Sequence, residues 1–254
     1  MDRWERQVYG AKPGVTLEGH MVGGLLKEEV RGVVQELAIK NELLPVEPSL
    51  ERESGRVIPG RDGCQIQVDQ SIQQVMEAGQ DQTLSLVRIT IPSCYQASDL
   101  QEAKKHLGDF QTRFSGSYQR YRNIALAADG INYTVVWPGQ VFSFNEVVGP
   151  RTPERGFLPA PVLIIGGSDL EYGGGVCQLA STLYNAVLHA GLQVVERHPH
   201  SRPVSYVPPG QDATVDYGAM DFSFRNSRSG PVIVQAGIHQ DNVWVYVLGK
   251  ENKS

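Results

Sequence analysis

GGGVCQ, at residues 173–178, leads directly into a helix-like run from Leu179 to Ala190. Three consecutive glycines let the backbone adopt turns that other residues rarely adopt, and they allow close approach to a ligand. Cys177 is expected at the entry of the helix, beside unpaired amide groups and the positive end of the helix dipole. Both features favour the thiolate, so the stretch predicts a nucleophilic cysteine with a lowered pKa. The expected oxyanion or substrate contacts are Gly174, Gly175 and Gln178.

The segment that follows the helix is expected to return towards Cys177. One apolar face of the helix is suited to burial: Leu179, Leu183, Val187 and Ala190. Gly191 is suited to end the helix, and residues 192–197 then have the pattern of a strand. About thirteen helical residues rise ~20 Å, and roughly six or seven extended residues also cover ~20 Å. A strand that folds back along the helix therefore brings His198 and His200 beside Cys177.

The two histidines are the candidate bases. Pro199 forces His198 into an extended conformation, so the side chains of His198 and His200 are expected on roughly the same side. One of them is expected to act as general base, and the other to bind substrate or orient the first. The third member of such a triad stays open among four residues: Ser201, Asp212, Asp216 and Asp221. We name Asp212 as the possible third member of the triad. Further candidate substrate contacts are Ser181, Thr182, Ser201, Arg202 and Tyr206.

Each of these features also has a non-catalytic interpretation. A cysteine at a helix start can be a packing residue, and a glycine-rich loop before a helix can hold an anion without any chemistry. The two histidines can lie in a surface turn, or they can join Cys177 in a zinc site with one sulfur and two nitrogens. The coincidence of loop, cysteine, helix and returning histidines favours catalysis, and neither a metal nor a cofactor is expected.

The composition excludes several classes of partner. Of the 254 residues, 41% are hydrophobic and 20% are charged, which is ordinary for a globular protein. The formal net charge of -5 argues against nucleic acid or an anionic membrane surface as the main partner. The sequence has no apolar run long enough to span a bilayer, and residues 1–6 lack the apolar core of a signal peptide.

Cysteine usage adds one open question. The three cysteines include no C-x-x-C pair, so metal-ribbon and thioredoxin-like readings are unsupported. Cys64 and Cys94 can form a disulfide in an oxidising compartment, or they can be two small buried side chains.

The fold class predicted from the pattern of elements is α+β. Residues 14–95 read as a small α+β module, residues 96–114 as a connecting amphipathic helix, and residues 115–250 as a second domain. In the second domain, a central helix after the glycine-rich loop is expected to pack on antiparallel strands. Four short strands are expected near the end of the chain, the last three of them in a meander: 213–217, 221–225, 231–238 and 243–248.

From about Ser115 to Gly249 the sequence resembles the VanW family. The resemblance rests on motifs in order: Arg122-Asn123-Ile124, Trp137 to Asn145, Val148 to Thr152, Gly173 to Gln178, Ser181 to Ala186, His198 to Ser201, Pro208-Pro209-Gly210 and Asp212 to Val215. Residues from about Val15 to Pro92 resemble, more weakly, a module expected to bind peptidoglycan that often precedes such domains.

The resemblance implies a role in the bacterial cell wall, with a link to vancomycin resistance. Some VanW-domain proteins are L,D-transpeptidases that depend on the motif cysteine, which is Cys177 here. Its thiolate attacks a peptidoglycan stem peptide (a muropeptide) and expels a D-amino acid, and an amine or water resolves the acyl-enzyme. The alternatives are a papain-like endopeptidase or amidase, and a non-catalytic wall-binding scaffold. The resemblance also implies an extracytoplasmic location, so we expect the sequence to start after a missing export signal or anchor.

Overall fold

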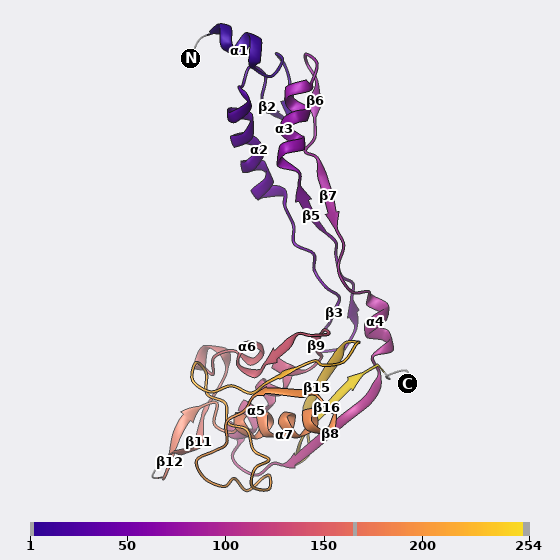
Figure 1. Cartoon of the computed structure of the whole chain (residues 1–254). Helices are drawn as coiled ribbons and strands as arrows, with labels where there is room; N and C mark the ends of the chain where they lie inside the picture. Colours follow the sequence, from indigo (N-terminus) through magenta and orange to yellow (C-terminus); the bar gives the residue numbers. More distant parts are fainter. Residues whose placement is uncertain (1–2, 165–166, 251–254) are drawn as a thin grey trace. The chain divides into compact units, whose positions relative to one another are not determined.

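The structure is a computed structural model that describes residues 3–164 and 167–250. The described chain forms two compact units, one from residues 3–47 and 59–96 and the other from residues 48–58, 97–164 and 167–250 (Figure 1). Helices and strands occur together in both units, which confirms the α+β class. None of the described helices is both long enough and apolar enough to cross a membrane.

The first unit has small sheets beside two helices. Its core contains Val30, Val34 and Leu37 of α2 together with Ile72 and Val75 of α3, so each helix buries one apolar face. The strands pair in the order β2-β1-β6, and β5 pairs with β7. The bounds are α1 Arg3–Tyr9, β1 Thr16–Leu17, β2 His20–Met21, α2 Lys27–Asn41, β5 Gly63–Ile66, α3 Val68–Glu77, β6 Thr83–Leu84 and β7 Arg88–Ile91.

The second unit holds the rest of the elements. Its first part contains β3 Ser49–Leu50, β4 Val57–Ile58, α4 Ala97–Glu102, β8 Lys105–Arg113, α5 Tyr118–Ile131, β9 Thr134–Val136, β10 Val141–Ser143, α6 Phe144–Val148 and the 3-10 turn Pro153–Arg155. Its second part contains β11 Pro159–Ile164, β12 Gly167–Tyr172, α7 Val176–His189, β13 Gln193–Glu196, β14 Ser223–Arg225, β15 Val232–His239 and β16 Asn242–Gly249.

The central helix α7 packs on an antiparallel sheet of order β8-β16-β15-β9. The strand comes close to the end of the helix at Gly108 of β8, where an added Cβ would lie 2.4 Å from the amide nitrogen of Ala190. A side chain at this position would therefore separate the strand from the end of α7. The helix α5 packs against both α7 and strand β15 of the same sheet. The two helices and the sheet enclose the main core.

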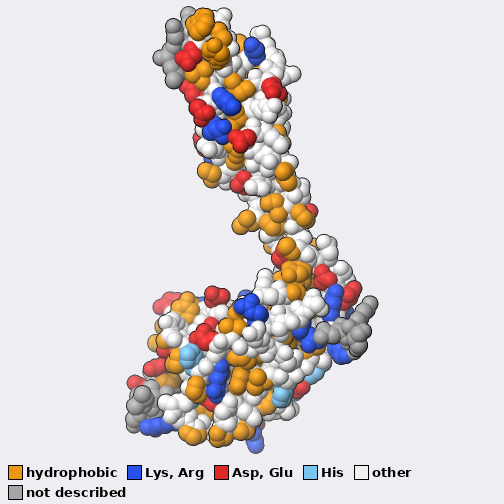
Figure 2. Space-filling view, in the orientation of Figure 1, with side chains coloured by type: hydrophobic (Ala, Val, Ile, Leu, Met, Phe, Trp, Pro, Cys, Tyr) orange, Lys and Arg blue, Asp and Glu red, His pale blue; other side chains and the backbone are white. Residues whose placement is uncertain are grey.

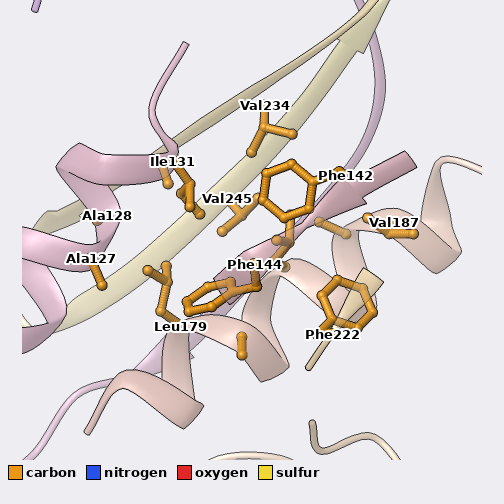
Figure 3. Packing of buried hydrophobic residues seen from close by; sticks show 14 of the residues in the cluster. Ala127, Ala128, Ile131, Phe142, Phe144, Leu179, Val187, Phe222, Val234 and Val245 are labelled. Atoms are coloured by element: carbon orange, nitrogen blue, oxygen red, sulfur yellow. The ribbon is translucent and has the colours of Figure 1, made fainter. Parts of the chain in front are cut away.

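Figure 3 shows how this core fills the space between the helices and the sheets. Three side chains are fully buried: Phe144 of α6, Leu179 of α7 and Phe222, and Val245 of β16 packs with them. Each such side chain contributes about 1.5–3 kcal/mol of burial free energy. The predicted apolar face of α7 is confirmed, because Leu179, Leu183 and Val187 have no exposed surface. This burial fixes the rotation of α7 and therefore the side on which Cys177 emerges.

Three sequence expectations about secondary structure are wrong. Residues 105–113 form a strand, β8, and not the second half of a connecting helix, because alternate residues face the core along β16. Residues 213–217 make isolated bridges instead of a strand. The expected meander ends at the β15–β16 hairpin, because β14 pairs with β10 and β13 in a separate sheet.

The surface carries both signs of charge. On the face shown in Figure 2, Lys and Arg side chains lie interspersed with Asp and Glu side chains in both units.

Candidate functional site

The glycine-rich loop is held by α5 and by the start of β11. Gly173 and Gly175 have positive φ angles of 85° and 106°, which favour glycine. Between them, an added Cβ on Gly174 would lie 2.4 Å from the carbonyl oxygen of Ala160. The buried Asn123 of α5 donates to the Gly174 carbonyl oxygen at 3.1 Å and to the Leu158 carbonyl oxygen at 2.8 Å. The loop is thus a rigid turn that starts α7 in a fixed direction.

Cys177 is the second residue of α7 and lies on the wall of a cavity of about 460 Å³. Its thiol donates a hydrogen bond to the carbonyl oxygen of Val215 at 3.5 Å. Burial raises the pKa of the Cys177 thiol, and the guanidinium groups of Arg151 and Arg120 oppose that rise. The expected lowered pKa is therefore wrong: removal from water outweighs the favourable charges nearby, and the resting group is a neutral thiol.

The backbone amides at the helix entry are partly used. The amide of Val176 donates to the Gly173 carbonyl oxygen at 3.0 Å, and that of Gln178 donates to the Gly175 carbonyl oxygen at 2.9 Å. Of the amides expected to be free near Cys177 and Gln178, that of Gln178 is therefore already paired. These bonds close the turn, and Gly175 and Gln178 line the cavity, whereas Gly174 is not among the described lining residues.

His200 lines the same cavity as Cys177 and is held by Asp212. The Nδ1 atom of His200 lies 2.7 Å from Oδ2 of Asp212, and the His200 backbone amide donates to the same oxygen at 2.6 Å. A carboxylate accepts hydrogen bonds and donates none, so Nδ1 carries a proton, and in the neutral tautomer Nε2 is the atom with the lone pair. Nε2 lies 3.5 Å from the hydroxyl of Tyr206, which also lines the cavity. The geometry is that of a histidine base oriented by an acid.

Asp212 is ionised in this arrangement. Burial disfavours its charged form, but hydrogen bonds from the backbone and the imidazole of His200 outweigh burial, so the pKa of Asp212 lies below its ordinary value. Arg197 adds a further partner, with Nη2 3.0 Å from Oδ1 of Asp212. Burial raises the pKa of Tyr206, so its hydroxyl keeps its proton at neutral pH. Tyr206 is therefore a hydrogen-bond donor at the cavity wall.

The two histidines do not converge as expected. The Nε2 atom of His198 pairs with Oε1 of Glu196 at 2.8 Å, and its side chain is 39% exposed against 12% for His200. Among the described residues that line the cavity, His198, Ser201 and Arg202 are absent. The backbone of His198 forms an isolated bridge with Thr214, and of the two histidines only His200 lines the cavity.

The remaining candidates on α7 are structural. Ser181 donates to the Cys177 carbonyl oxygen at 2.8 Å and accepts from the Ala213 amide at 2.8 Å. Thr182 donates to the carbonyl oxygen of Gln178 at 2.7 Å. Both hydroxyls are buried, and the described cavity lining does not include them. Ser181 therefore ties the helix to the loop that carries Asp212, rather than contacting a ligand directly.

The other candidate acids have different surroundings. Asp221 accepts from the hydroxyl of Ser143 and, at 2.9 Å, from the Asn145 amide, so it anchors the start of α6. Asp216 is exposed and lines the cavity. Neither is hydrogen-bonded to His200 in the described structure, which leaves Asp212 as the carboxylate on the imidazole.

Two arginines that the sequence analysis missed complete the cavity. Arg120 of α5 donates from Nη2 to Oε1 of Gln178 at 2.8 Å. Arg151 donates from Nη1 to Oδ1 of Asn145 at 2.6 Å, and its guanidinium lies 5.5 Å from the centre of the Phe144 ring. Arg151 lies within a quoted family motif, which was a usable signal, whereas no local pattern marks Arg120.

The cavity walls contain two unsatisfied polar atoms. Within the described chain, Nη2 of Arg151 and Oγ1 of Thr214 are buried and have no hydrogen-bond partner. Both residues line the cavity. Leaving such a group unpaired costs about 1–3 kcal/mol, and more for a charged group. An arrangement of this kind is favourable once a ligand supplies the missing acceptor.

The zinc and disulfide alternatives have no support in the geometry. Over the described residues, no group of three or more His, Cys, Asp and Glu side chains is placed to hold a metal ion. His198 points to Glu196, so the set of one sulfur and two imidazoles is not assembled. Cys64 and Cys94 are free thiols.

Comparison with known proteins gives one family and two relatives. Residues 119–248 match the model of the family described as VanW like protein. The uncharacterized protein YoaR of Bacillus subtilis is 38% identical over 187 residues, covering 72% of this chain and 62% of YoaR. The vancomycin B-type resistance protein VanW of Enterococcus faecalis is 30% identical over 127 residues, covering 47% of this chain and 46% of that protein. The matches thus span less than two thirds of either relative, and no solved structure matches the chain.

Proposed function

This chain belongs to the VanW family, and we propose that it is a cell-wall enzyme that transfers acyl groups of peptidoglycan stem peptides through Cys177. The observation that carries the proposal is the shared cavity of Cys177, Tyr206 and His200, with Asp212 bonded to Nδ1 of the imidazole. The name of the enterococcal relative places that protein in vancomycin resistance. We extend a cell-envelope role, and with it an extracytoplasmic location, to this chain.

In the proposed reaction, His200 accepts the Cys177 proton at Nε2 as the sulfur attacks the amide carbonyl before the terminal residue of the stem. The Sγ–C bond forms while the carbonyl becomes an oxyanion, and the protonated Tyr206 hydroxyl donates a hydrogen bond to it. As the C–N bond breaks, His200 returns the proton to the leaving amine, and a free D-amino acid departs. The product on the protein is a thioester, with no change of oxidation state.

The second half of the reaction restores the thiol. An amine from a neighbouring stem attacks the thioester, loses a proton to His200, and forms a new amide, while Sγ leaves and takes the proton back. Water as the attacking group gives a trimmed stem instead. A neutral thiol on the cavity wall suits this scheme, because deprotonation is then coupled to attack rather than completed beforehand.

The test is incubation of the full chain with muropeptides that carry tetrapeptide stems, followed by liquid chromatography and mass spectrometry. We expect release of the terminal D-amino acid together with cross-linked dimers. Cys177→Ala is expected to abolish both products, while Cys94→Ala, which changes an exposed thiol, retains them.

Other outcomes separate the alternatives. Trimmed monomers without dimers favour a papain-like endopeptidase or amidase with water as acceptor. Unchanged muropeptides contradict catalysis and favour a wall-binding scaffold. For residues 14–95 we propose peptidoglycan binding, which co-sedimentation of the full chain with purified cell-wall sacculi tests: protein that stays in the supernatant contradicts it.

A further inference from the structure

The arginine wall of the cavity, formed by Arg120 and Arg151, carries two positive charges that the described chain does not neutralise by ion pairing. The hydrogen-bond partners of the two guanidinium groups are neutral amides, Gln178 for Arg120 and Asn145 for Arg151. Burial lowers the pKa of both side chains, yet an arginine stays protonated in proteins. The wall therefore holds two cations partly removed from water.

The arginines are held in place from behind. Asn145, which accepts from Arg151, donates in turn to the carbonyl oxygens of Met220 at 2.8 Å and Asp216 at 3.1 Å. Gln178, which accepts from Arg120, donates to the Thr112 hydroxyl at 3.0 Å. Each amide is thereby oriented with its oxygen towards the guanidinium. The arrangement fixes one nitrogen of each arginine, and both residues line the cavity.

The glycine-rich loop makes room for the same two side chains. An added Cβ on Gly173 would lie 2.7 Å from Cγ of Arg151, and one on Gly175 would lie 2.8 Å from Cγ of Arg120. Larger residues would therefore displace both arginine stems. The loop that starts the Cys177 helix is also the surface on which the two arginines rest.

We infer that the arginine wall binds the free C-terminal carboxylate of the substrate peptide through the guanidinium groups of Arg120 and Arg151. Within the described chain, Nη2 of Arg151 is buried and has no hydrogen-bond partner, although buried donors nearly always have one, and its residue lines the cavity. A carboxylate is an acceptor that matches the planar guanidinium fork. The inference rests on the proposed function and names its substrate class: stem peptides that end in an unamidated residue, which is the residue expelled.

The distribution of charge around the cavity limits where such an anion can lie. Glu171 and Asp216 also line the cavity, and both are exposed. They repel a carboxylate at the open side, whereas Arg120 and Arg151 attract it at the inner side. Both arginines lie within electrostatic reach of Cys177, because each lowers the pKa of that thiol. A terminal carboxylate bound on this wall therefore lies near the sulfur. The proposed reaction requires this, because the amide that Cys177 attacks is only one residue away from that carboxylate.

The test compares two probes on the full chain with Cys177→Ala, which prevents turnover. The probes are a synthetic stem tetrapeptide ending in D-Ala with a free carboxylate, and the same peptide with a C-terminal amide. We expect isothermal titration calorimetry to show the acid binding about ten-fold tighter or more. Arg151→Gln in this background is expected to reduce the preference to about two-fold or less, with Arg151→Lys in between. Arg122→Gln, an exposed arginine on the same helix as Arg120, is the matched control and keeps the preference.

Three results overturn the inference: equal affinity for acid and amide, a preference that survives Arg151→Gln, or no binding of the acid at millimolar concentration. The first of these needs no arginine variant, so it stands even if Arg151→Gln fails to fold. The proposed function fails separately. If wild-type protein gives no product from any muropeptide while the acid preference persists, carboxylate binding is right and acyl transfer is wrong.

Discussion

The arginine wall of the cavity, Arg120 and Arg151, differs from the histidine wall, His200 and Tyr206, in how completely its polar atoms are paired. On the histidine wall, Asp212 accepts from the His200 imidazole and amide and from Arg197. On the arginine wall, Nη2 of Arg151 is buried and has no hydrogen-bond partner among the described residues. A closed network fixes the orientation of a base, whereas an open one leaves binding capacity for a ligand. The two walls therefore suit two tasks, proton transfer and substrate recognition.

The largest expected effect concerns the histidine wall. Asp212→Asn is expected to lower kcat for muropeptide turnover by at least about 100-fold, because the carboxylate that holds the His200 tautomer is lost. Glu196→Gln is the matched control: it changes the acid that pairs with the exposed His198 and is expected to leave kcat within about two-fold. Equal losses in both variants would remove the distinction between the two histidines.

A substitution in the glycine-rich loop, on which the arginine side chains rest, is expected to have a smaller effect, measured as a change in stability. Gly175→Ala places a Cβ 2.8 Å from Cγ of Arg120 at a φ of 106°. We expect it to lower the free energy of unfolding by about 1–3 kcal/mol more than Gly191→Ala does. Gly191 also has a positive φ, of 66°, but nothing lies within 4 Å of its added Cβ. Urea unfolding of both variants measures the difference, and identical values would contradict close packing against Arg120.

The rate at which Cys177 is alkylated tests how burial and the arginine wall set the pKa of its thiol. Because burial raises the pKa of Cys177, iodoacetamide at pH 7 is expected to alkylate it more slowly than the exposed Cys94. Arg151→Gln removes a cation that lowers this pKa, so alkylation of Cys177 is expected to slow further. Peptide mass spectrometry against time follows both sites. Faster labelling of Cys177 than of Cys94 at pH 6 would show that the resting group is a thiolate after all.

The smallest expected effect is the pH dependence of stability. The pKa of Asp212 is below its ordinary value in the folded protein. The ionised carboxylate therefore stabilises the fold at pH values above the ordinary carboxyl pKa of about 3.9. This contribution is lost as the pH falls through the pKa that Asp212 has in the folded protein. The difference in free energy of unfolding between wild type and Asp212→Asn is therefore expected to shrink from about pH 6 to about pH 2. Urea titrations at a series of pH values measure it. A constant difference would mean that the Asp212 charge does not contribute.

The fold of the second unit was predictable where local pattern and burial coincide. The apolar face of α7 and the hairpin β15–β16 follow from periodicity in the sequence. The strand at residues 105–113 was not predictable, because the amphipathic character of these residues fits a helix as well as a strand. Long-range pairing with β16 decides between the two. Likewise, Ser223–Arg225 pairs with strands that are distant in sequence rather than with its chain neighbour β15.

The candidate site was predictable only in part for a similar reason. The spacing from Cys177 to residue 200 follows from the lengths of a helix and a returning strand, and the cavity does contain both side chains. The choice of Asp212 over Asp216 and Asp221 depends on the path of the long connection 197–222, which no local pattern fixes. Arg120 and Arg151 come from elements far from the loop in sequence. The pKa of Cys177 depends on burial, which the sequence at a helix start does not reveal.

The most direct test of the account is intact-mass analysis of the full chain after brief exposure to a stem tetrapeptide. The account predicts a mass increase equal to the acyl tripeptide, mapped by proteolysis to Cys177 rather than to Cys64 or Cys94, and absent from Cys177→Ala. In Asp212→Asn the same adduct is expected to form much more slowly. An adduct on another residue, or turnover of the peptide by Cys177→Ala, would contradict the assignment of Cys177 as the nucleophile.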